Sequence, residues 1–183
     1  MSTTETLIRD VAIGSKGAFA ALYRALQPQM LRYATGLLAG DRSAAEDAVD
    51  EAFAAVWTQA GQYTGQGSAD GWVRRIVRNK AVDFARRNRE SSIGKADQDW
   101  LDQTPSDHIS PFEEAANQSD RQWLGAALAR LSPDHREAVW LCYYEEQPLA
   151  QIAAIMGCPE NTVKTRLFHA RKQLHAMLAV VDA

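Results

Sequence analysis

Hydrophobic residues recur every three or four positions along most of this chain, which is the spacing of one face of an α-helix. In the first half, the pattern predicts helices over residues 15–39, 43–59 and 71–88. It resumes at residue 111 and ends in two short helices between Leu149 and Arg171. No stretch shows the two-residue alternation of a half-buried strand. The sequence therefore predicts an all-α fold.

Four of the predicted helices begin after serine residues, whose hydroxyls accept hydrogen bonds from amides that a first helical turn leaves unpaired. Ser43 also stands three residues before Glu46, which is the spacing of a capping box. Pro28 falls inside the first predicted helix and is expected to kink it, because proline removes an internal hydrogen bond. The serine caps are Ser15, Ser43, Ser110 and Ser132, the last two followed directly by proline.

Between residues 89 and 110 the helical period disappears, and the segment is polar, acidic and rich in turn-forming residues. Such a composition is typical of a linker. A shorter stretch, AGQYTGQGSADG, predicts a loop between the second and third helices. We therefore expect two small helical domains, at residues 1–88 and 111–183, joined by a flexible acidic linker at residues 89–110.

Charge is distributed unevenly along the 183 residues, although the formal net charge is only −3. Residues 72–89 hold seven basic residues against one acidic residue, whereas residues 88–122 hold three against eight. In the last third, the basic residues gather on the final helix. Two basic helices separated by an acidic segment indicate two nucleic-acid contacts rather than general binding of polyanions.

The segment LAQIAAIMGCPENTVKTRLFHAR carries the most informative local pattern. Its two apolar faces are separated by Gly157, Cys158 and Pro159, which predict a tight turn. The second helix is basic, with no acidic residue between Asn161 and Val181. This arrangement is typical of a helix-turn-helix whose second helix enters a DNA major groove. An ordinary helical hairpin with a solvated basic face is the alternative.

Other classes of protein are disfavoured by the sequence. No apolar run approaches the roughly 18 residues that span a membrane, and the N-terminus does not resemble a secretion signal. Cys142 and Cys158 have no CxxC spacing, so we expect reduced, buried thiols in the cytoplasm. The histidines show no metal-binding spacing, and there is no phosphate loop or nucleophile motif. We therefore expect no metal, no cofactor and no enzymatic activity.

Four longer segments carry a resemblance to a known family. The first half contains AFAALYRALQPQMLRYATGLL, AEDAVDEAFAAVW and GWVRRIVRNKAVDFARR, and the last third contains LSPDHREAVWLCYYEEQPLAQIAAIMGCPENTVKTRLFHARKQL. In this order they resemble regions 2 and 4 of bacterial sigma factors of the extracytoplasmic-function (ECF) type, across most of residues 15–178. The departures are small: Pro148 replaces a usual Ser or Thr cap, Asn161 a common glycine and His169 a common arginine.

The resemblance implies that the first domain binds core RNA polymerase and melts the −10 element of a promoter, while the second domain reads the −35 element. The partners it implies are promoter DNA, an anti-sigma factor, and core polymerase contacted through its clamp coiled coil and its flap. It places the protein in the cytoplasm, without membrane insertion.

Reading of the −35 element falls to the second helix of the predicted helix-turn-helix. Side chains at base edges specify sequence, whereas phosphate contacts position the protein without specifying it. The residues expected at base edges are Lys164, Thr165, Phe168 and His169, those expected at phosphates are Arg166, Arg171 and Lys172, and Thr162 completes the set.

Melting of the −10 element requires a base to be extruded, at a cost on the order of a few kcal/mol. A loop pocket beside a cationic helix suits this task, and residues 63–70 and the helix that follows supply both. Trp72 opens the apolar stripe of that helix and is interpreted as core, and any single arginine there is alternatively a solvated side chain. The −10 set is Tyr63, Gln66, Ser68, Arg74, Arg75, Arg78, Asn79, Lys80, Arg86 and Arg87.

The acidic, partly apolar helix at residues 46–59 is the expected contact with polymerase. The alternative is that its acids are only solvated, and for Phe53 a place in the core is favoured. The polymerase set is Asp47, Asp50, Glu51, Phe53 and Trp57.

Two further hypotheses concern regulation. The acidic linker, through Asp97, Asp99 and Asp102, folds against the basic helices of the free protein and suppresses DNA binding. The alternative function is a sigma mimic that sequesters an anti-sigma factor. A mimic has no need of DNA-contacting cations, however, and both basic helices carry them.

Overall fold

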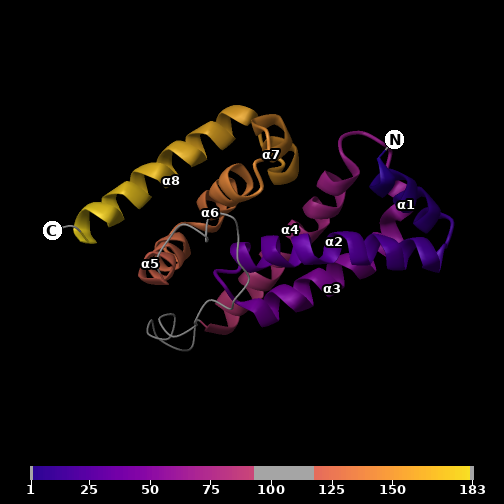
Figure 1. Cartoon of the computed structure of the whole chain (residues 1–183), viewed down its shortest axis with the longest axis horizontal. Coiled ribbons are helices and arrows are strands. Elements are labelled where there is room, and N and C mark those ends of the chain that lie inside the picture. The colour runs from indigo at the N-terminus through magenta and orange to yellow at the C-terminus, as the bar shows by residue number, and fades with distance from the viewer. Residues whose placement is uncertain (1, 93–117, 182–183) are drawn as a thin grey trace. The chain divides into compact units, whose positions relative to one another are not determined.

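The computed structural model of the protein describes residues 2–92 and 118–181, and all regular elements within these ranges are helices (Figure 1). The helices fall into two compact units, one with α1 to α4 and the other with α5 to α8. The predicted all-α fold with two helical units is confirmed.

The first unit consists of α1 (Thr3–Ala12), α2 (Lys16–Leu37), α3 (Arg42–Gln59), the single 3-10 turn η1 (Ala60–Gln62) and α4 (Ala69–Ser92). A short turn joins α2 to α3, so the two lie side by side and antiparallel, and α4 packs against both (Figure 1). Burial of large side chains from all four helices forms one core. Its largest fully buried members include Ile8, Leu22, Met30, Tyr33, Val49, Phe53, Val56 and Val73.

Not every predicted cap is found: α3 begins at Arg42, so Ser43 lies inside its first turn and the predicted cap at Ser43 is wrong. The Ser15 hydroxyl accepts a hydrogen bond from the Ala18 amide at 3.2 Å, as the sequence predicts. Helix α2 continues past Pro28 to Leu37. Helix α4 begins earlier than predicted and ends at Ser92, so the first residues of the predicted linker are helical. The rest of that linker lies outside the described residues.

Helix α1 is not predicted by the periodicity. The Ser2 hydroxyl accepts a hydrogen bond from the Glu5 amide at 3.2 Å, which caps the helix. Ile8 and Val11 are buried against the rest of the unit. The signal was the spacing of Ser2 and Glu5, the S-x-x-E pattern of a capping box.

The second unit consists of α5 (Gln118–Ala129), α6 (Pro133–Val139), the π-helical turn η3 (Trp140–Tyr144), α7 (Leu149–Met156) and α8 (Glu160–Val181). The helix start predicted after Ser110 lies outside the described residues. The start predicted after Ser132 is confirmed, because the Ser132 hydroxyl accepts a hydrogen bond from the His135 amide at 3.3 Å.

Arg136 fixes the turn between α5 and α6. It is buried, and its guanidinium donates to the carbonyls of Leu128 (2.9 Å), Ala129 (2.7 Å) and Leu131 (3.1 Å). Carbonyls at the end of a helix have no partner within the helix. One arginine therefore closes the end of α5 and sets where α6 begins.

The π-helical turn η3 was not predicted. Within it, the Trp140 and Tyr144 rings stack with their centroids 4.3 Å apart and Tyr144 is half-buried, whereas Tyr143 is exposed. The extra residue of a π-helical turn rotates the side chains that follow it. Of the two tyrosines in this turn, Tyr144 is therefore the one that packs inward.

Candidate nucleic-acid and protein interfaces

Helices α7 and α8 form a helix-turn-helix. Gly157 ends α7 with φ +63° and ψ 37°, the left-handed conformation that glycine adopts without a Cβ penalty. The Cys158 amide donates to the Ala153 carbonyl at 3.1 Å, which closes the turn. Pro159 then starts the next helix by accepting from the Val163 amide at 3.2 Å. The apolar faces meet through Ile152, Ile155 and Met156 of α7 and Val163, Leu167 and Ala170 of α8, all buried.

The opposite face of α8 is open to solvent. Phe168 is 58% exposed, which is unusual for a phenylalanine, and its ring packs edge-on to His169 at 5.4 Å. The Thr165 hydroxyl donates to the Asn161 carbonyl at 2.9 Å, so its proton is engaged within the helix and its lone pairs remain available. The exposed residues on this face are Lys164, Thr165, Phe168, His169, Arg171 and Lys172, and Thr162 is half-buried.

Arg166 differs from the other predicted contacts of α8. Its guanidinium lies 2.7 Å from the Asp134 carboxylate of α6 and 3.6 Å from the Cys158 sulfur. The arginine side chain is only 23% exposed. Arg166 therefore ties α8 to α6 and to the turn, and its predicted role as a phosphate contact gains no support from this geometry.

The two thiols are less buried than the sequence suggested. Cys142 and Cys158 are free thiols, but each is only half-buried, so the expectation that they are buried is wrong. Partial burial raises the pKa of the Cys142 thiol, and the nearby charge of Arg171 opposes that rise. The neutral thiol of Cys142 is thereby favoured.

In the first unit, the predicted −10 loop is held by its own contacts. The Tyr63 hydroxyl donates to the Gly67 carbonyl at 3.3 Å, and the Tyr63 ring packs 5.6 Å from that of Trp72. Burial, with the charge of Glu5 as a further cause, raises the pKa of Tyr63. Ser68 accepts from the Gly71 amide at 3.0 Å at the start of α4, and Gln66 is exposed.

Arg74 corrects the prediction that α4 exposes its arginines. It is 2% exposed, and its guanidinium lies 5.7 Å from the centre of the Tyr33 ring. Arg74 stands three residues before Val77 and seven before Ala81, so it shares their buried face. A side chain in this position is not available to a DNA strand in the structure described.

The other cations that were predicted for the −10 contact on α4 reach the surface. Arg78 and Lys80 are half-buried, and the exposed members of the predicted set on this helix are Arg75, Asn79, Arg86 and Arg87. Arg86 lies 4.0 Å from Asp83, one turn away on the same helix. The cationic face of α4 therefore contains fewer arginines than the sequence suggested, because Arg74 is buried.

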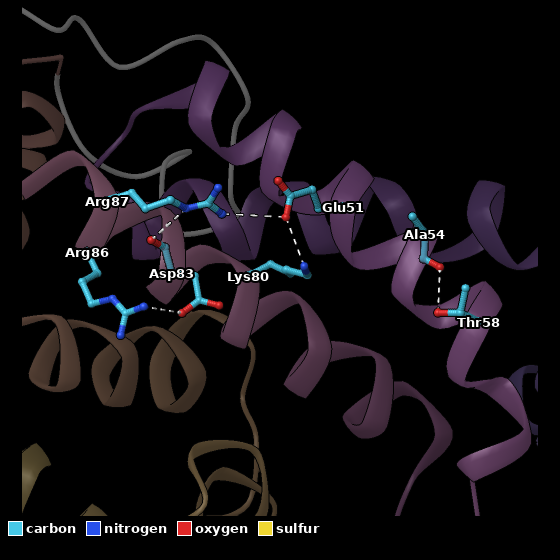
Figure 2. A network of polar contacts seen from close by, with 7 residues as sticks. All are labelled: Glu51, Ala54, Thr58, Lys80, Asp83, Arg86 and Arg87. Carbon is cyan, nitrogen blue, oxygen red and sulfur yellow. Dashed lines mark hydrogen bonds and ion pairs between the residues drawn. The ribbon is translucent and has the colours of Figure 1, made fainter. Parts of the chain in front are cut away.

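Glu51 joins α3 to this cationic face, as Figure 2 shows. One of its carboxylate oxygens accepts a hydrogen bond from the Lys80 ammonium at 3.1 Å and lies 3.8 Å from the Arg87 guanidinium. A residue predicted for the polymerase contact thus pairs with two residues predicted for the −10 contact. Sequence spacing did not indicate this link, because the partners lie 29 residues or more apart.

The exposed stripe of α3 combines carboxylates with an aromatic ring. Asp47 and Asp50 are exposed, and the Tyr23 hydroxyl of α2 donates to Asp50 at 3.1 Å. Trp57 is 36% exposed and packs edge-on to Phe19 of α2 at 5.3 Å. Sequence reasoning missed that Tyr23 and Phe19 extend this stripe onto α2.

Phe53 belongs to the core, as the favoured interpretation held. It is 2% exposed and lies against the Tyr23 ring at 4.7 Å. A direct polymerase contact by Phe53 is not compatible with that burial. The ring instead supports Tyr23, which in turn holds Asp50.

Comparison with known proteins identifies the family to which the chain belongs. Residues 22–91 match Sigma-70 region 2, and residues 121–174 match Sigma-70, region 4. The chain is 36% identical over 172 residues to the ECF RNA polymerase sigma factor SigL of Mycobacterium tuberculosis, an alignment that covers 90% of this chain and 93% of SigL. The chain belongs to the ECF RNA polymerase sigma factors.

Solved structures agree with this assignment. The sigma factor RpoE of Bartonella quintana, crystallised with the anti-sigma factor NepR, is 26% identical, with a TM-score of 0.67 over 88% of this chain and 97% of RpoE. CnrH, solved in complex with the cytosolic domain of CnrY, shares the fold with a TM-score of 0.70 at 21% identity, over 98% of this chain and 99% of CnrH. None of the described helices is long and apolar enough to cross a membrane.

Proposed function

We propose that this chain binds core RNA polymerase and directs transcription initiation at promoters that carry particular −35 and −10 elements. The observation that carries the proposal is the presence of both sigma regions on one chain, each with an exposed face suited to its task. The chain supplies recognition and strand separation, and the polymerase supplies the chemistry in the cytoplasm.

Helix α8 reads the −35 element from the major groove. Lys164 and His169 offer hydrogen-bond donors, and the exposed Phe168 ring suits a thymine methyl group. Arg171 and Lys172 contact the phosphates on either side. The support for this role is that all five side chains share the solvent face of the second helix of a helix-turn-helix.

The loop at residues 63–68 and the exposed face of α4 take up the −10 element. Tyr63 is half-buried against Trp72, and an aromatic ring at a loop provides a platform for an extruded base. Asn79 is exposed on the same helix as Arg75 and offers both a donor and an acceptor. The cations of α4 then follow the separated strand.

The exposed stripe of α3 takes up core polymerase. Asp47 and Asp50 provide negative charge and Trp57 provides an exposed apolar surface, the combination that steers and then anchors a basic partner. Tyr23 holds the Asp50 carboxylate in place before the partner arrives. Preorganisation of this kind reduces the entropy lost on binding.

An anti-sigma factor that holds the protein inactive is part of the proposal. The support is that RpoE, at 26% identity, was crystallised with the anti-sigma factor NepR. The corresponding partner of this chain is identified by a capture experiment. The intact protein is the bait, a lysate depleted of polymerase is the source of partners, and core polymerase is the competitor.

Run-off transcription tests the proposal directly. Bacterial core polymerase is combined with the purified chain and a fragmented genomic template, and core polymerase alone serves as the control. We expect discrete new start sites that share −35 and −10 sequences. A folded chain that binds core polymerase but yields no new transcripts would overturn the proposal.

A further inference from the structure

One carboxylate oxygen of Glu51 serves two cations on α4, the Lys80 ammonium at 3.1 Å and the Arg87 guanidinium at 3.8 Å (Figure 2). Lys80 and Arg87 are seven residues apart, which places them two turns apart on one face of the helix. Both side chains therefore reach towards α3 from the same side. A single side chain in the proposed polymerase surface thus holds two members of the proposed strand-binding face.

The three side chains lie at the surface. Their exposed fractions are 42% for Glu51, 33% for Lys80 and 53% for Arg87. Ion pairs with this degree of exposure are weak and are readily exchanged for a better partner. A phosphate approaching the cations, or a basic group approaching the carboxylate, can therefore break the contact.

We propose that Glu51 is a positioning residue that couples polymerase binding to binding of the −10 strand. In the free chain its single negative charge partly offsets the two positive charges of Lys80 and Arg87 and lowers their attraction for DNA phosphates. When a basic group of polymerase takes up Glu51, the two cations are released to the strand. The inference rests on the proposed function and adds a regulatory contact to it.

Coupling of this kind is reciprocal, because each site must change the affinity of the other by the same factor. A strand that takes up Lys80 and Arg87 frees Glu51 for polymerase. Binding to each partner is therefore favoured by the presence of the other, and the free chain binds stray single strands less well than its cations alone would allow.

The other carboxylates of α3 are placed differently. Glu46 pairs with Arg42 within α3 at 2.9 Å, and Asp50 accepts from Tyr23 of α2. Asp83, a carboxylate of α4, pairs with Arg86 of the same helix. Glu51 is the one with contacts from α3 to α4 in the network of Figure 2. Glu46 is therefore a matched control, since it lies on the same helix and carries the same charge.

Two variants of the full chain test the coupling, Glu51→Gln and Glu46→Gln. Polymerase-free binding of a fluorescent single-stranded oligonucleotide is measured at low and high salt. We expect Glu51→Gln to bind about two- to five-fold tighter than Glu46→Gln at low salt, with the difference shrinking as salt screens the pair. Equal affinities of the two variants would overturn the proposal.

The same variants are then tested with core polymerase. Glu51→Gln is expected to weaken binding to the polymerase while strengthening binding to the strand, whereas a merely structural role would weaken both. In a Lys80→Ala, Arg87→Ala background, Glu51→Gln should no longer strengthen strand binding. An undiminished gain in that background would also overturn the coupling.

Circular dichroism establishes that the variants fold. Glu51→Asp, which withdraws the carboxylate by one methylene, is a further variant at this position. Its affinity for the strand is expected to lie between that of the wild type and that of Glu51→Gln. A wild-type chain that supports run-off transcription while Glu51→Gln and Glu46→Gln bind the strand equally refutes only the coupling. A wild-type chain without transcripts refutes the proposed function itself.

Discussion

The Arg166 guanidinium on the recognition helix α8 lies 2.7 Å from the Asp134 carboxylate in the first turn of α6. Two interactions stabilise the Asp134 carboxylate there: the ion pair with Arg166 and the attraction of a helix N-terminus for negative charge. The pair joins residues 32 positions apart and connects the helix that faces DNA to the helix behind it. We infer that it sets the orientation of α8 rather than contacting DNA.

Asp134→Asn and Arg166→Gln are therefore expected to have the same effect, because each removes the same ion pair. Each should lower the free energy of unfolding by about 1 kcal/mol, and the double variant should lose little more than either single variant. Both single variants should weaken −35 binding. Urea unfolding and DNA titration measure the two effects.

The opposing outcome is specific. If Arg166 clamps a phosphate, Arg166→Gln weakens DNA binding, whereas Asp134→Asn releases the guanidinium and strengthens it. Opposite effects of the two substitutions on DNA affinity would restore the role that the sequence alone suggested for Arg166.

Helical periodicity and caps predicted most of the fold. Ser15, Ser132 and Gly157 mark ends that the structure confirms, because each is satisfied by local hydrogen bonds or by a local backbone angle. Helix α1 was missed, although Ser2 and Glu5 carry a capping pattern, because only two of its residues reach full burial. The π-helical turn at Trp140 depends on packing that no local pattern reveals.

The interfaces were less predictable than the fold. Exposure of Phe168 and Lys164 followed from their places on the face opposite the apolar stripe of α8. The charge pattern wrongly predicted that Arg74 is exposed, whereas it is buried against Tyr33. The contacts of Arg166 and Glu51 join segments far apart in the chain, so tertiary packing decides them.

The left-handed backbone at Gly157 should make the turn sensitive to substitution. Gly157→Ala meets no atom within 4 Å, so its cost is conformational, about 1 kcal/mol. Gly17→Ala is the matched control, because Gly17 is exposed on α2, where alanine is favoured by about 0.5–1 kcal/mol. Thermal unfolding should show opposite shifts for the two variants. A neutral Gly157→Ala would contradict the strain argument.

Loss of the Tyr23 hydroxyl should weaken polymerase binding with little effect on the fold. Tyr23→Phe keeps the ring against Phe53 and removes the hydrogen bond to Asp50, a change of about 0.5–1.5 kcal/mol. Affinity for core polymerase is measured for Tyr23→Phe, Asp50→Asn and the double variant. Additive losses would show that Tyr23 does not act through Asp50.

The same substitution has a pH signature. Burial, followed by the hydrogen bond and the charge of Asp50, raises the pKa of Tyr23 above its usual value of 10.0. A group with a raised pKa contributes stability that is complete below the unfolded pKa and is lost as pH rises through the folded pKa. The wild type should therefore lose stability relative to Tyr23→Phe at alkaline pH, above about 10. Parallel stability curves across that range would contradict this.

Lys164 and Arg171 separate sequence reading from phosphate binding on one helix. Both are exposed on α8, and the Arg171 guanidinium also donates to the Leu167 carbonyl at 3.3 Å, which directs it along the helix. Lys164→Ala should reduce the preference for a matched over a scrambled −35 site by about tenfold, since one base contact contributes about 1–3 kcal/mol of discrimination. Arg171→Ala should weaken binding to both sites alike and lower the slope of the salt dependence by about 1, the value for one lost phosphate contact.

Titration of both variants against both duplexes at several salt concentrations measures these effects, with Lys172→Ala as a second phosphate variant. Equal losses on matched and scrambled sites for Lys164→Ala would mean that Lys164 binds a phosphate, and sequence preference would then rest on Phe168 and His169, whose rings pack together at the same exposed face.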